Sequence, residues 1–342
     1  MAPYILLTKA QAQAAAGQAA AALNTWNRLI AEYPGSAAAA EALYQLGAQS
    51  IPTGSDATTA GATTPLAPAT RYWDTLLNEI PSHPRSVEVA FKLLSSLPPK
   101  NTDAATAEPA PSTDPSTAPS TAPSTAPSTA LAKPASTSLD ELSLLKIVTY
   151  HGLGHPQYIE TLDRLSDEYS DNLTPADWAA IGFGYWETQN YASAGEAYSK
   201  APQDTPVNLY RAARGQERGD KIQAAIAAYQ TLNQAFPTAP ETATGLLNMA
   251  NLVPVPIAIA TLDQLRERFP DQAAEALMRR AALLDKINSP GSAKQARASV
   301  LSQYSDSEAA AEIRLEEAKT SAAKGDYPSA ISWAQQLISA AT

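Results

Sequence analysis

Histidine is the residue type with the clearest potential for chemistry in this sequence, and the chain has three: His83, His151 and His155. The last two stand in a His-Gly-Leu-Gly-His string, which imitates the i, i+4 spacing of a helical zinc pair. Gly152 and Gly154 would break that helix, and Gly152 occupies the position where a metalloprotease motif has Glu. The string therefore predicts a loop or helix start rather than a metal site, and His83, flanked by Ser and Pro, predicts an exposed turn.

The other catalytic signatures are absent or incomplete. The chain has no Cys, which excludes disulfides, thiolate metal ligands and thiol nucleophiles. The Gly182–Gly184 string is too short for a dinucleotide-binding fingerprint and lies in an Ala-rich helical pattern, where it predicts a close contact between helices. There is no phosphate-binding loop of the Walker type and no Gly-x-Ser-x-Gly elbow. We therefore predict no catalytic, cofactor-binding or metal-binding residue, and no cofactor.

The charge balance limits the possible partners. The formal net charge is −10, with 24 basic and 34 acidic residues, and the sequence pI is near 4.9. Nucleic-acid binding requires clustered Lys and Arg, so nucleic acid is not an expected partner. No stretch reaches the roughly 18 apolar residues that span a bilayer, and the N-terminus lacks the pattern of a secretory signal. We predict no transmembrane segment.

A spacing of large residues that is typical of one face of an α-helix recurs along the chain and predicts the elements that position the residues above. We call it the stripe. It consists of a large residue, Leu three positions later, an aromatic or aliphatic residue four positions after that, and usually Pro or Ser. The clear instances are Trp26-Leu29-Tyr33-Pro34, Trp73-Leu76-Ile80-Pro81, Leu162-Leu165-Tyr169-Ser170, Tyr229-Leu232-Phe236-Pro237 and Leu262-Leu265-Phe269-Pro270. This spacing is one face of an α-helix, and the Pro marks where the helix ends.

The period of the stripe predicts the architecture. Its equivalent positions after Leu162, which are Tyr198, Tyr229, Leu262, Arg297 and Trp333, follow one another after 36, 31, 33, 35 and 36 residues. A tetratricopeptide repeat has a period of about 34 residues and forms a helix–turn–helix pair. The partner helices are Ala-rich runs at Ala42–Gly47, Ala179–Trp186, Leu209–Arg214, Ala243–Met249, Ala276–Leu284 and Ala311–Ala318. We predict an all-α, tetratricopeptide-like α-solenoid, with turns inside the pairs at Gly17-Gln18, Gln189-Asn190, Gly219-Asp220 and Gly325-Asp326.

Two stretches interrupt the repeats and define the expected domain organisation. Residues 51–67 predict a flexible loop, and the Pro-Ser-Thr-Ala stretch at 98–138 has too few large apolar residues to offset the entropy of ordering, so it predicts a disordered insert. The expected helical parts are an N-terminal repeat at 1–50, a repeat at 68–97 and a tetratricopeptide-like array at 139–342.

The tryptophans on the stripes are expected to lie in the core rather than to serve as platforms for sugars. These are Trp26, Trp73, Trp186 and Trp333, whereas Trp178 lies near an expected helix start.

Several longer strings resemble the N-terminal helical region of bacterial soluble lytic murein transglycosylases. They are Ala2–Leu7 with Ala10-Gln11-Ala12, Leu173–Glu187, Phe269–Leu277, Leu284–Pro290 and Ser292–Arg297. Together with the repeats, the resemblance covers nearly all of the chain outside the insert. It implies a superhelix that, in that family, precedes a lysozyme-like domain which cleaves peptidoglycan to 1,6-anhydro products.

The catalytic motifs of that family do not occur in this sequence. The family has a catalytic Glu in a Glu-Ser dipeptide followed by Gly-Leu-Met-Gln, whereas no Glu here precedes Ser and the only methionines are Met1, Met249 and Met278. No catalytic residue can be carried over, so we expect a non-enzymatic chain that is a truncated product or a fragment of a longer reading frame.

Two functions are compatible with these observations. The resemblance implies a cell-wall scaffold in the periplasm or envelope, with peptidoglycan or an envelope protein as partner, although the absence of a signal peptide predicts a cytoplasmic protein if the chain is complete. The alternative is a tetratricopeptide adaptor that binds a protein or peptide in its concave groove. A complete enzyme would need a catalytic domain that the sequence does not show.

Overall fold

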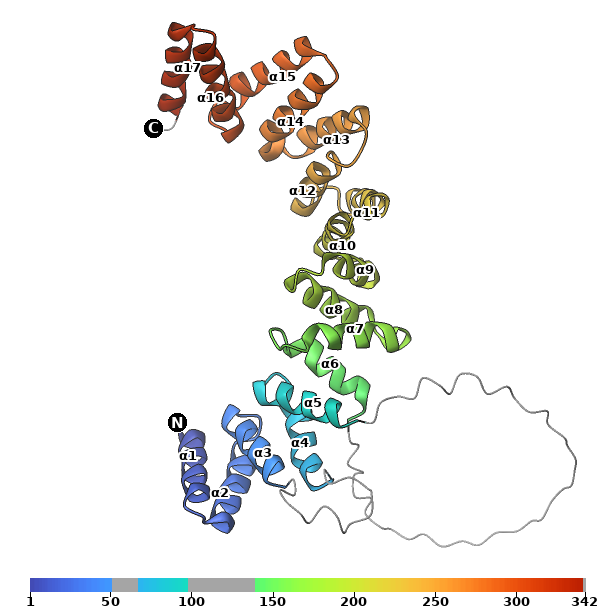
Figure 1. The fold of residues 1–342 in the computed structure, drawn as a ribbon, viewed down its shortest axis with the longest axis vertical. Coiled ribbons are helices and arrows are strands. Elements are labelled where there is room, and N and C mark those ends of the chain that lie inside the picture. The colour runs from blue at the N-terminus through green and yellow to red at the C-terminus, as the bar shows by residue number, and fades with distance from the viewer. Residues whose placement is uncertain (51–66, 98–138, 341–342) are drawn as a thin grey trace, which may run out of the picture. The chain divides into compact units, whose positions relative to one another are not determined.

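A computed structural model of the chain describes residues 1–50, 67–97 and 139–340 (Figure 1). Within these residues the chain forms 17 α-helices and two short 3-10 helices, and no strand. The all-α prediction is therefore confirmed. The chain divides into two compact units, unit 1 at Met1–Glu168 and unit 2 at Tyr169–Thr342, which are described separately below.

The helices of unit 1 are α1 (Ala2–Ala15), α2 (Ala19–Glu32), α3 (Ala37–Gln49), α4 (Ala67–Glu79), α5 (Pro84–Ser96), α6 (Glu141–His151) and α7 (Tyr158–Glu168). Those of unit 2 are α8 (Pro175–Glu187), α9 (Tyr191–Lys200), α10 (Pro206–Arg218), α11 (Ile222–Ala235), α12 (Pro240–Met249), α13 (Val255–Arg268), α14 (Ala273–Lys286), α15 (Pro290–Gln303), α16 (Glu308–Ala323) and α17 (Tyr327–Ala340). Short 3-10 helices at Ser170–Asn172 and Pro270–Gln272 precede α8 and α14.

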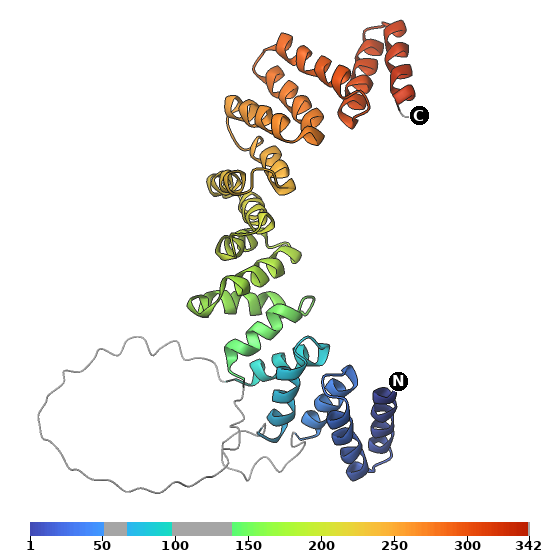
Figure 2. The same ribbon diagram turned by 180° about the vertical axis from the view of Figure 1, so that it is seen from behind.

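Successive helices pack as pairs that stack in chain order within each unit (Figures 1 and 2). The pairs are α1/α2 and α3/α4 in unit 1, and α8/α9, α10/α11, α12/α13, α14/α15 and α16/α17 in unit 2. We call the members of a pair its first and second helix. In unit 1, α5 packs against α3, α4 and α6, and α6 packs against α7. The architecture is a tetratricopeptide-like α-solenoid, as predicted.

The predicted stripe is the buried face of the second helices. On α2, Trp26 is 2% exposed and Leu29 is fully buried, and on α4 the exposed fraction of Trp73 is 1%. The first helices contribute small residues to the same interfaces, such as Ala38 and Ala42 of α3 against Trp26. Large side chains on one helix and small ones on the next allow close packing, because a bulky pair would push the two helices apart.

Five turns inside the pairs share one backbone feature, which the turn between α12 and α13 lacks. Gly17, Gln189, Asp220, Asn288 and Gly325 all have φ between 55° and 80°, the left-handed region that terminates a helix within one residue. The predicted turns are therefore confirmed. At Gly219-Asp220 the left-handed residue is Asp220, whereas Gly219 lies so close to Ala192 that an added Cβ would be 2.7 Å from the Ala192 Cβ.

Side-chain caps fix where several first helices begin. In each case an Oγ accepts a hydrogen bond from the backbone N–H three residues later, which satisfies an amide that has no partner inside the helix. The caps of this kind are Ser36 for α3, Thr174 for α8, Thr205 for α10 and Ser307 for α16. At α8 the Asp177 carboxylate also accepts from the Thr174 N–H at 2.8 Å, which completes a capping box.

Backbone contact is closest where α9 meets α10 in unit 2. A Cβ added at Gly195 would lie 2.5 Å from the Gln216 nitrogen, and one added at Gly215 would lie 2.6 Å from the Gly195 Cα. Nearby, a Cβ at Gly182 would lie 2.9 Å from the Tyr198 ring, which confirms the predicted close helix contact at the Gly182–Gly184 string.

The predicted loop at 51–67 and the predicted insert at 98–138 lie outside the described residues, apart from residue 67, where α4 begins. The pair α3/α4 has one helix on each side of the first of these stretches. In the part of the chain that the structure describes, every helix is too short or too polar to cross a membrane.

The Gly195 contact generates a stability prediction. Gly195→Ala should destabilise the protein by about 1–3 kcal/mol, because the new methyl group meets backbone atoms that cannot rotate away. The measurement is the urea midpoint followed by far-UV circular dichroism. Gly291→Ala in α15 is the matched control, since a Cβ there meets nothing within 4 Å; it should leave the stability unchanged or raise it by up to roughly 1 kcal/mol. Equal effects of the two substitutions would contradict the close-contact account.

Candidate functional site

The three histidines serve as helix-end and packing residues. His151 is the last residue of α6, and His155 lies in the turn before α7, where its ring stacks on Phe91 with centroids 3.7 Å apart. The string lies in the turn between α6 and α7 from Gly152 onward, as predicted, whereas His151 ends the preceding helix. His83 is half-buried rather than exposed, because its Nδ1 caps α5 by accepting from the Arg85 N–H at 3.2 Å. Among the described residues, no group of three or more His, Asp or Glu is placed to hold a metal ion.

The tryptophans divide into buried and half-buried positions. Trp26 and Trp73 lie in the core as predicted, and Trp178 is only 7% exposed, with the Lys200 ammonium 3.9 Å from its ring centroid. Trp186 and Trp333 are half-buried, which corrects the prediction that they belong to the core.

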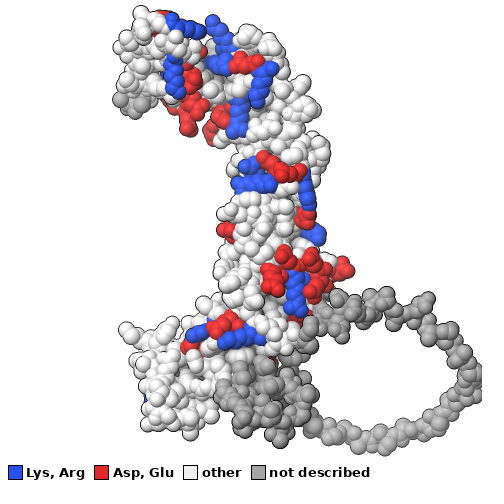
Figure 3. All heavy atoms as spheres, viewed as in Figure 1, with Lys and Arg blue, Asp and Glu red and all other residues white. Residues whose placement is uncertain are grey.

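Charged side chains gather over α3 and α5, over α7, and over α14–α16 (Figure 3). In unit 1, the charged side chains that join α3 to α5 pair with one another. Arg85 donates from Nε to Glu41 at 2.8 Å and from Nη1 to Glu88 at 2.7 Å, and its guanidinium lies 4.3 Å from the centre of the Tyr44 ring. Lys92 donates to both Tyr44 and Glu88 at 2.7 Å. Each of these polar groups has a partner within the group, so its role is to hold the two helices together.

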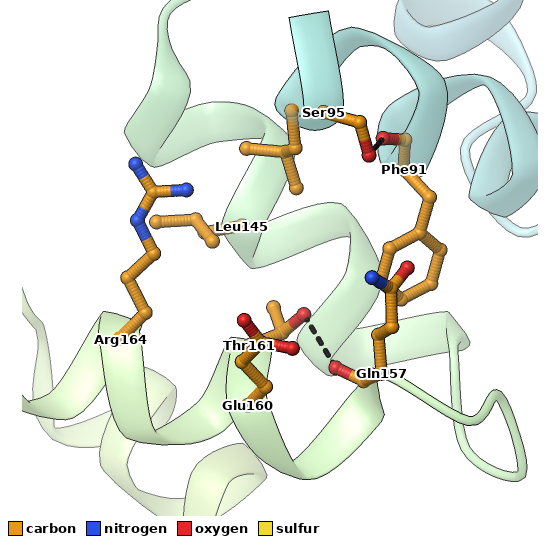
Figure 4. Close-up of a pocket in the computed structure, with 8 residues that line it drawn as sticks. Phe91, Ser95, Leu145, Gln157, Glu160, Thr161 and Arg164 are labelled. Carbon is orange, nitrogen blue, oxygen red and sulfur yellow. Dashed lines mark hydrogen bonds between the residues drawn. The ribbon is translucent and has the colours of Figure 1, made fainter. Parts of the chain in front are cut away.

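A small hollow of about 130 Å³ lies in unit 1 between α5, α6 and α7 (Figure 4). Several polar groups around it have partners within the protein. Arg164 pairs with Glu141 and, at 3.3 Å, with Glu168, while the Thr161 hydroxyl donates to the Gln157 carbonyl at 3.0 Å. A space of this size holds only a few water molecules. We interpret it as a packing gap rather than a binding site.

A larger hollow of about 530 Å³ lies in unit 2, within the usual range of ligand sites. We call it the acidic hollow. Its lining comes entirely from first helices and the residues that lead into them: Leu247 of α12; Asp271, Gln272, Ala274, Glu275 and Arg279 at α14; and Ser307, Glu308, Ala309 and Glu312 at α16.

The floor and the rim of the acidic hollow differ in chemistry. Leu247, Ala274 and Ala309 are buried and form an apolar floor, and the two small alanines leave the space open. Four carboxylates and one guanidinium make up the charged part of the lining. Arg279 pairs with Glu275 at 2.5 Å and donates to the Leu247 carbonyl at 3.3 Å.

The remaining carboxylates of the acidic hollow are Asp271, Glu308 and Glu312. None of the three forms an ion pair within the described part of the chain. The hollow therefore carries an excess of negative charge beside an apolar floor.

The acidic hollow belongs to a face that runs along the first helices of unit 2. Asn248 of α12 donates to the Tyr210 hydroxyl of α10 at 3.4 Å, and Arg279 links α14 to α12. The hollow itself bridges α14 and α16. First helices from successive pairs thus lie next to one another, and side chains about one repeat apart in sequence share one surface.

Comparison with known families agrees with this geometry. The family model of the tetratricopeptide repeat matches residues 4–36 and 208–239, which cover the pairs α1/α2 and α10/α11. The chain carries tetratricopeptide repeats. Stacked repeats of this kind form scaffolds with extended binding surfaces. No curated protein matches the chain. The specific resemblance to lytic murein transglycosylases stays a prediction from the sequence.

The acidic hollow was not predicted, although the tetratricopeptide period contains a signal for it. Asp271 and Glu275 recur 37 residues later as Glu308 and Glu312, so an acidic i, i+4 pair lies at the start of the first helix in two successive pairs, with Asp271 in the 3-10 helix before α14 and Glu308 in the first turn of α16. Such a pair presents both carboxylates on one side of a helix. Aligning the repeats by position, rather than searching for catalytic motifs, would have indicated a shared acidic surface.

The group between α3 and α5 generates a prediction on pH. Partial burial alone would raise the pKa of Glu88, but hydrogen bonds from Lys92, Tyr44 and Arg85 outweigh it and lower the pKa to about 2. A carboxyl whose pKa is lowered by folding stabilises the native state above its unfolded pKa, near 4.5, and loses that contribution as the pH falls toward 2.

Glu88→Gln should therefore lower the melting temperature at pH 6–7, and the difference from the unmodified protein should shrink steadily below about pH 4.5. Glu79→Gln, at an exposed position of α4, is the control and should shift the melting temperature little at any pH. A Glu88→Gln difference that grows as the pH falls would contradict the assignment.

Proposed function

We propose that this protein is a non-catalytic scaffold that binds a polypeptide partner on the first-helix face of unit 2. The acidic hollow is the observation that carries the proposal. It combines an apolar floor at Leu247, Ala274 and Ala309 with three carboxylates that form no ion pair with a cation of the described residues.

This combination fits a basic, extended segment of a protein. The aliphatic stem of Lys or Arg packs on an apolar floor while its charged end reaches a carboxylate rim. Charge-assisted hydrogen bonds to Asp271, Glu308 and Glu312 would provide affinity and orientation. The same groups suit a glycan strand less well, because no aromatic ring lines the hollow to stack on a sugar. A protein adaptor is therefore the better-supported alternative of the two that the sequence left open.

Peptide binding tests the proposal directly. Short fluorescent peptides rich in Lys and Arg should bind the full chain in an anisotropy titration, whereas isosteric peptides with Gln at the basic positions should not. Glu308→Gln/Glu312→Gln should weaken the binding of the basic peptides by roughly tenfold, the effect of losing one to two net charge contacts.

The matched control is Glu316→Gln/Glu317→Gln, which removes the same charge from the same helix outside the hollow. Glu308 lies in the first turn of α16, where its loss costs about 0.3–1 kcal/mol of helix stability, so each variant is also compared by its unfolding midpoint. Equal loss of binding in both double variants would contradict the assignment. Retention of the chain on purified peptidoglycan sacculi, with no binding of basic peptides, would favour the cell-wall scaffold instead.

A further inference from the structure

A second surface of unit 2 has the opposite charge. Arg211 and Arg218 lie seven residues apart on α10, which places them on the same side of the helix with Cα atoms about 10 Å apart along its axis. Arg211 is half-buried and Arg218 is exposed. Neither forms an ion pair with a carboxylate of the described residues.

Aromatic rings hold the two guanidinium groups in place. Trp186 of α8 lies between them, with its ring centroid 5.9 Å from Arg211 and 5.5 Å from Arg218. Arg218 also lies 4.1 Å from the centre of the Tyr191 ring, and Phe183, which is 41% exposed, is 6.0 Å from Arg211. We call Phe183, Trp186, Tyr191, Arg211 and Arg218 the arginine–aromatic face.

Most side-chain N–H groups of Arg211 and Arg218 donate to no group of the described residues. Arg211 donates from Nη1 to the Tyr198 hydroxyl at 2.7 Å, and a guanidinium has five N–H donors. The neighbouring Glu187 is exposed and pairs with neither arginine. Four other arginines of unit 2 pair with carboxylates, at Arg214–Glu217, Arg279–Glu275, Arg280–Asp263 and Arg297–Asp285, whereas Arg266, Arg268 and Arg314 form no ion pair with the described residues.

Within the described part of unit 2, the aromatic rings around Arg211 and Arg218 are what distinguish these two arginines, in a chain whose net charge is −10. Stacking restricts the side-chain freedom of Arg211 and Arg218 before any ligand arrives, so less entropy is lost when the ligand binds.

We propose that the arginine–aromatic face binds an acidic, partly apolar peptide segment in extended conformation. In the extended polyproline II conformation a peptide has three residues per turn and rises about 3.1 Å per residue, so carboxylates at positions i and i+3 lie on one side about 9 Å apart and would reach both guanidinium groups. An apolar side chain near the first carboxylate would pack on the exposed edge of Phe183. This proposal shares with the proposed function only the premise that unit 2 binds polypeptides, and it uses no residue of the acidic hollow.

The test uses the full chain and three labelled peptides with one sequence framework: Leu followed by Glu-x-x-Glu, the same peptide with Gln at both Glu positions, and one with the two Glu residues adjacent. The Glu-x-x-Glu peptide should bind, and the Gln peptide and the adjacent-Glu peptide should bind at least roughly tenfold more weakly. Arg211→Gln/Arg218→Gln should weaken the Glu-x-x-Glu peptide by a similar factor.

Lys294→Gln/Lys324→Gln is the matched control, because it removes two exposed positive charges from unit 2 away from this face. It should change the affinity less than twofold, the size expected of a long-range screened charge effect. Phe183→Ala should weaken the Leu-containing peptide but not a peptide with Gly at that position, which separates packing from charge.

The outcomes distinguish this proposal from the proposed function. Binding of basic peptides that depends on Glu308 and Glu312, without binding of the Glu-x-x-Glu peptide at millimolar concentration, would overturn only the arginine–aromatic face. Binding of the Glu-x-x-Glu peptide alone would overturn only the acidic hollow. Equal competition by inorganic polyphosphate or by single-stranded RNA, with no preference for the i, i+3 spacing, would show a general anion surface and would overturn the peptide proposal.

Discussion

The distance at which consecutive helices can approach each other controls the geometry of unit 2. At α9 and α10 the backbones meet at Gly195 and Gly215, where a single added Cβ would lie 2.5–2.6 Å from backbone atoms of the other helix. On the next interface, Gly182 allows the Tyr198 ring to lie against α8. These contacts fix the angle and separation of α8, α9 and α10 more tightly than a layer of large side chains would, because backbone atoms cannot adopt another rotamer. The position of Arg211 relative to Trp186 depends on the same contacts.

Stacking at a regular separation brings together side chains that are distant in sequence. Glu275 and Glu312 are 37 residues apart but line one hollow, because α14 and α16 occupy equivalent places in adjacent pairs. Both helices of a pair contribute to the core, with large stripe residues such as Tyr229 and Leu262 on second helices and residues such as Leu246 on first helices. Only the exposed positions of the first helices can vary in charge at little cost to folding, and two surfaces of unit 2 that use such positions have opposite charge.

The fold was largely predictable from the sequence, and the sites were not. The stripe around Trp26, Trp73 and Leu262 repeats with a period that only stacked helical pairs satisfy, so the helices, their pairing and most turns were predictable. Trp186 was assigned to the core on the same grounds, but it is half-buried beside the arginines of α10. Periodicity along one helix indicates which face is buried. It does not indicate whether a side chain at the edge of that face, such as Trp186, is covered by the neighbouring pair. The acidic hollow depends on small floor residues such as Ala274 and Ala309, whose effect on open space is visible only once the helices are placed.

The central claim is that the first-helix face of unit 2, rather than the opposite surface, contacts a polypeptide. Site-specific photocrosslinking in cells that express the chain tests it most directly. A photoreactive amino acid would replace Glu312 in the acidic hollow or, as the comparison, Gln295 on the exposed side of the second helix α15. We predict a discrete crosslinked product from position 312 that protease digests, and none from position 295. A product from both positions, or one that is removed by a peptidoglycan hydrolase and not by protease, would contradict the account.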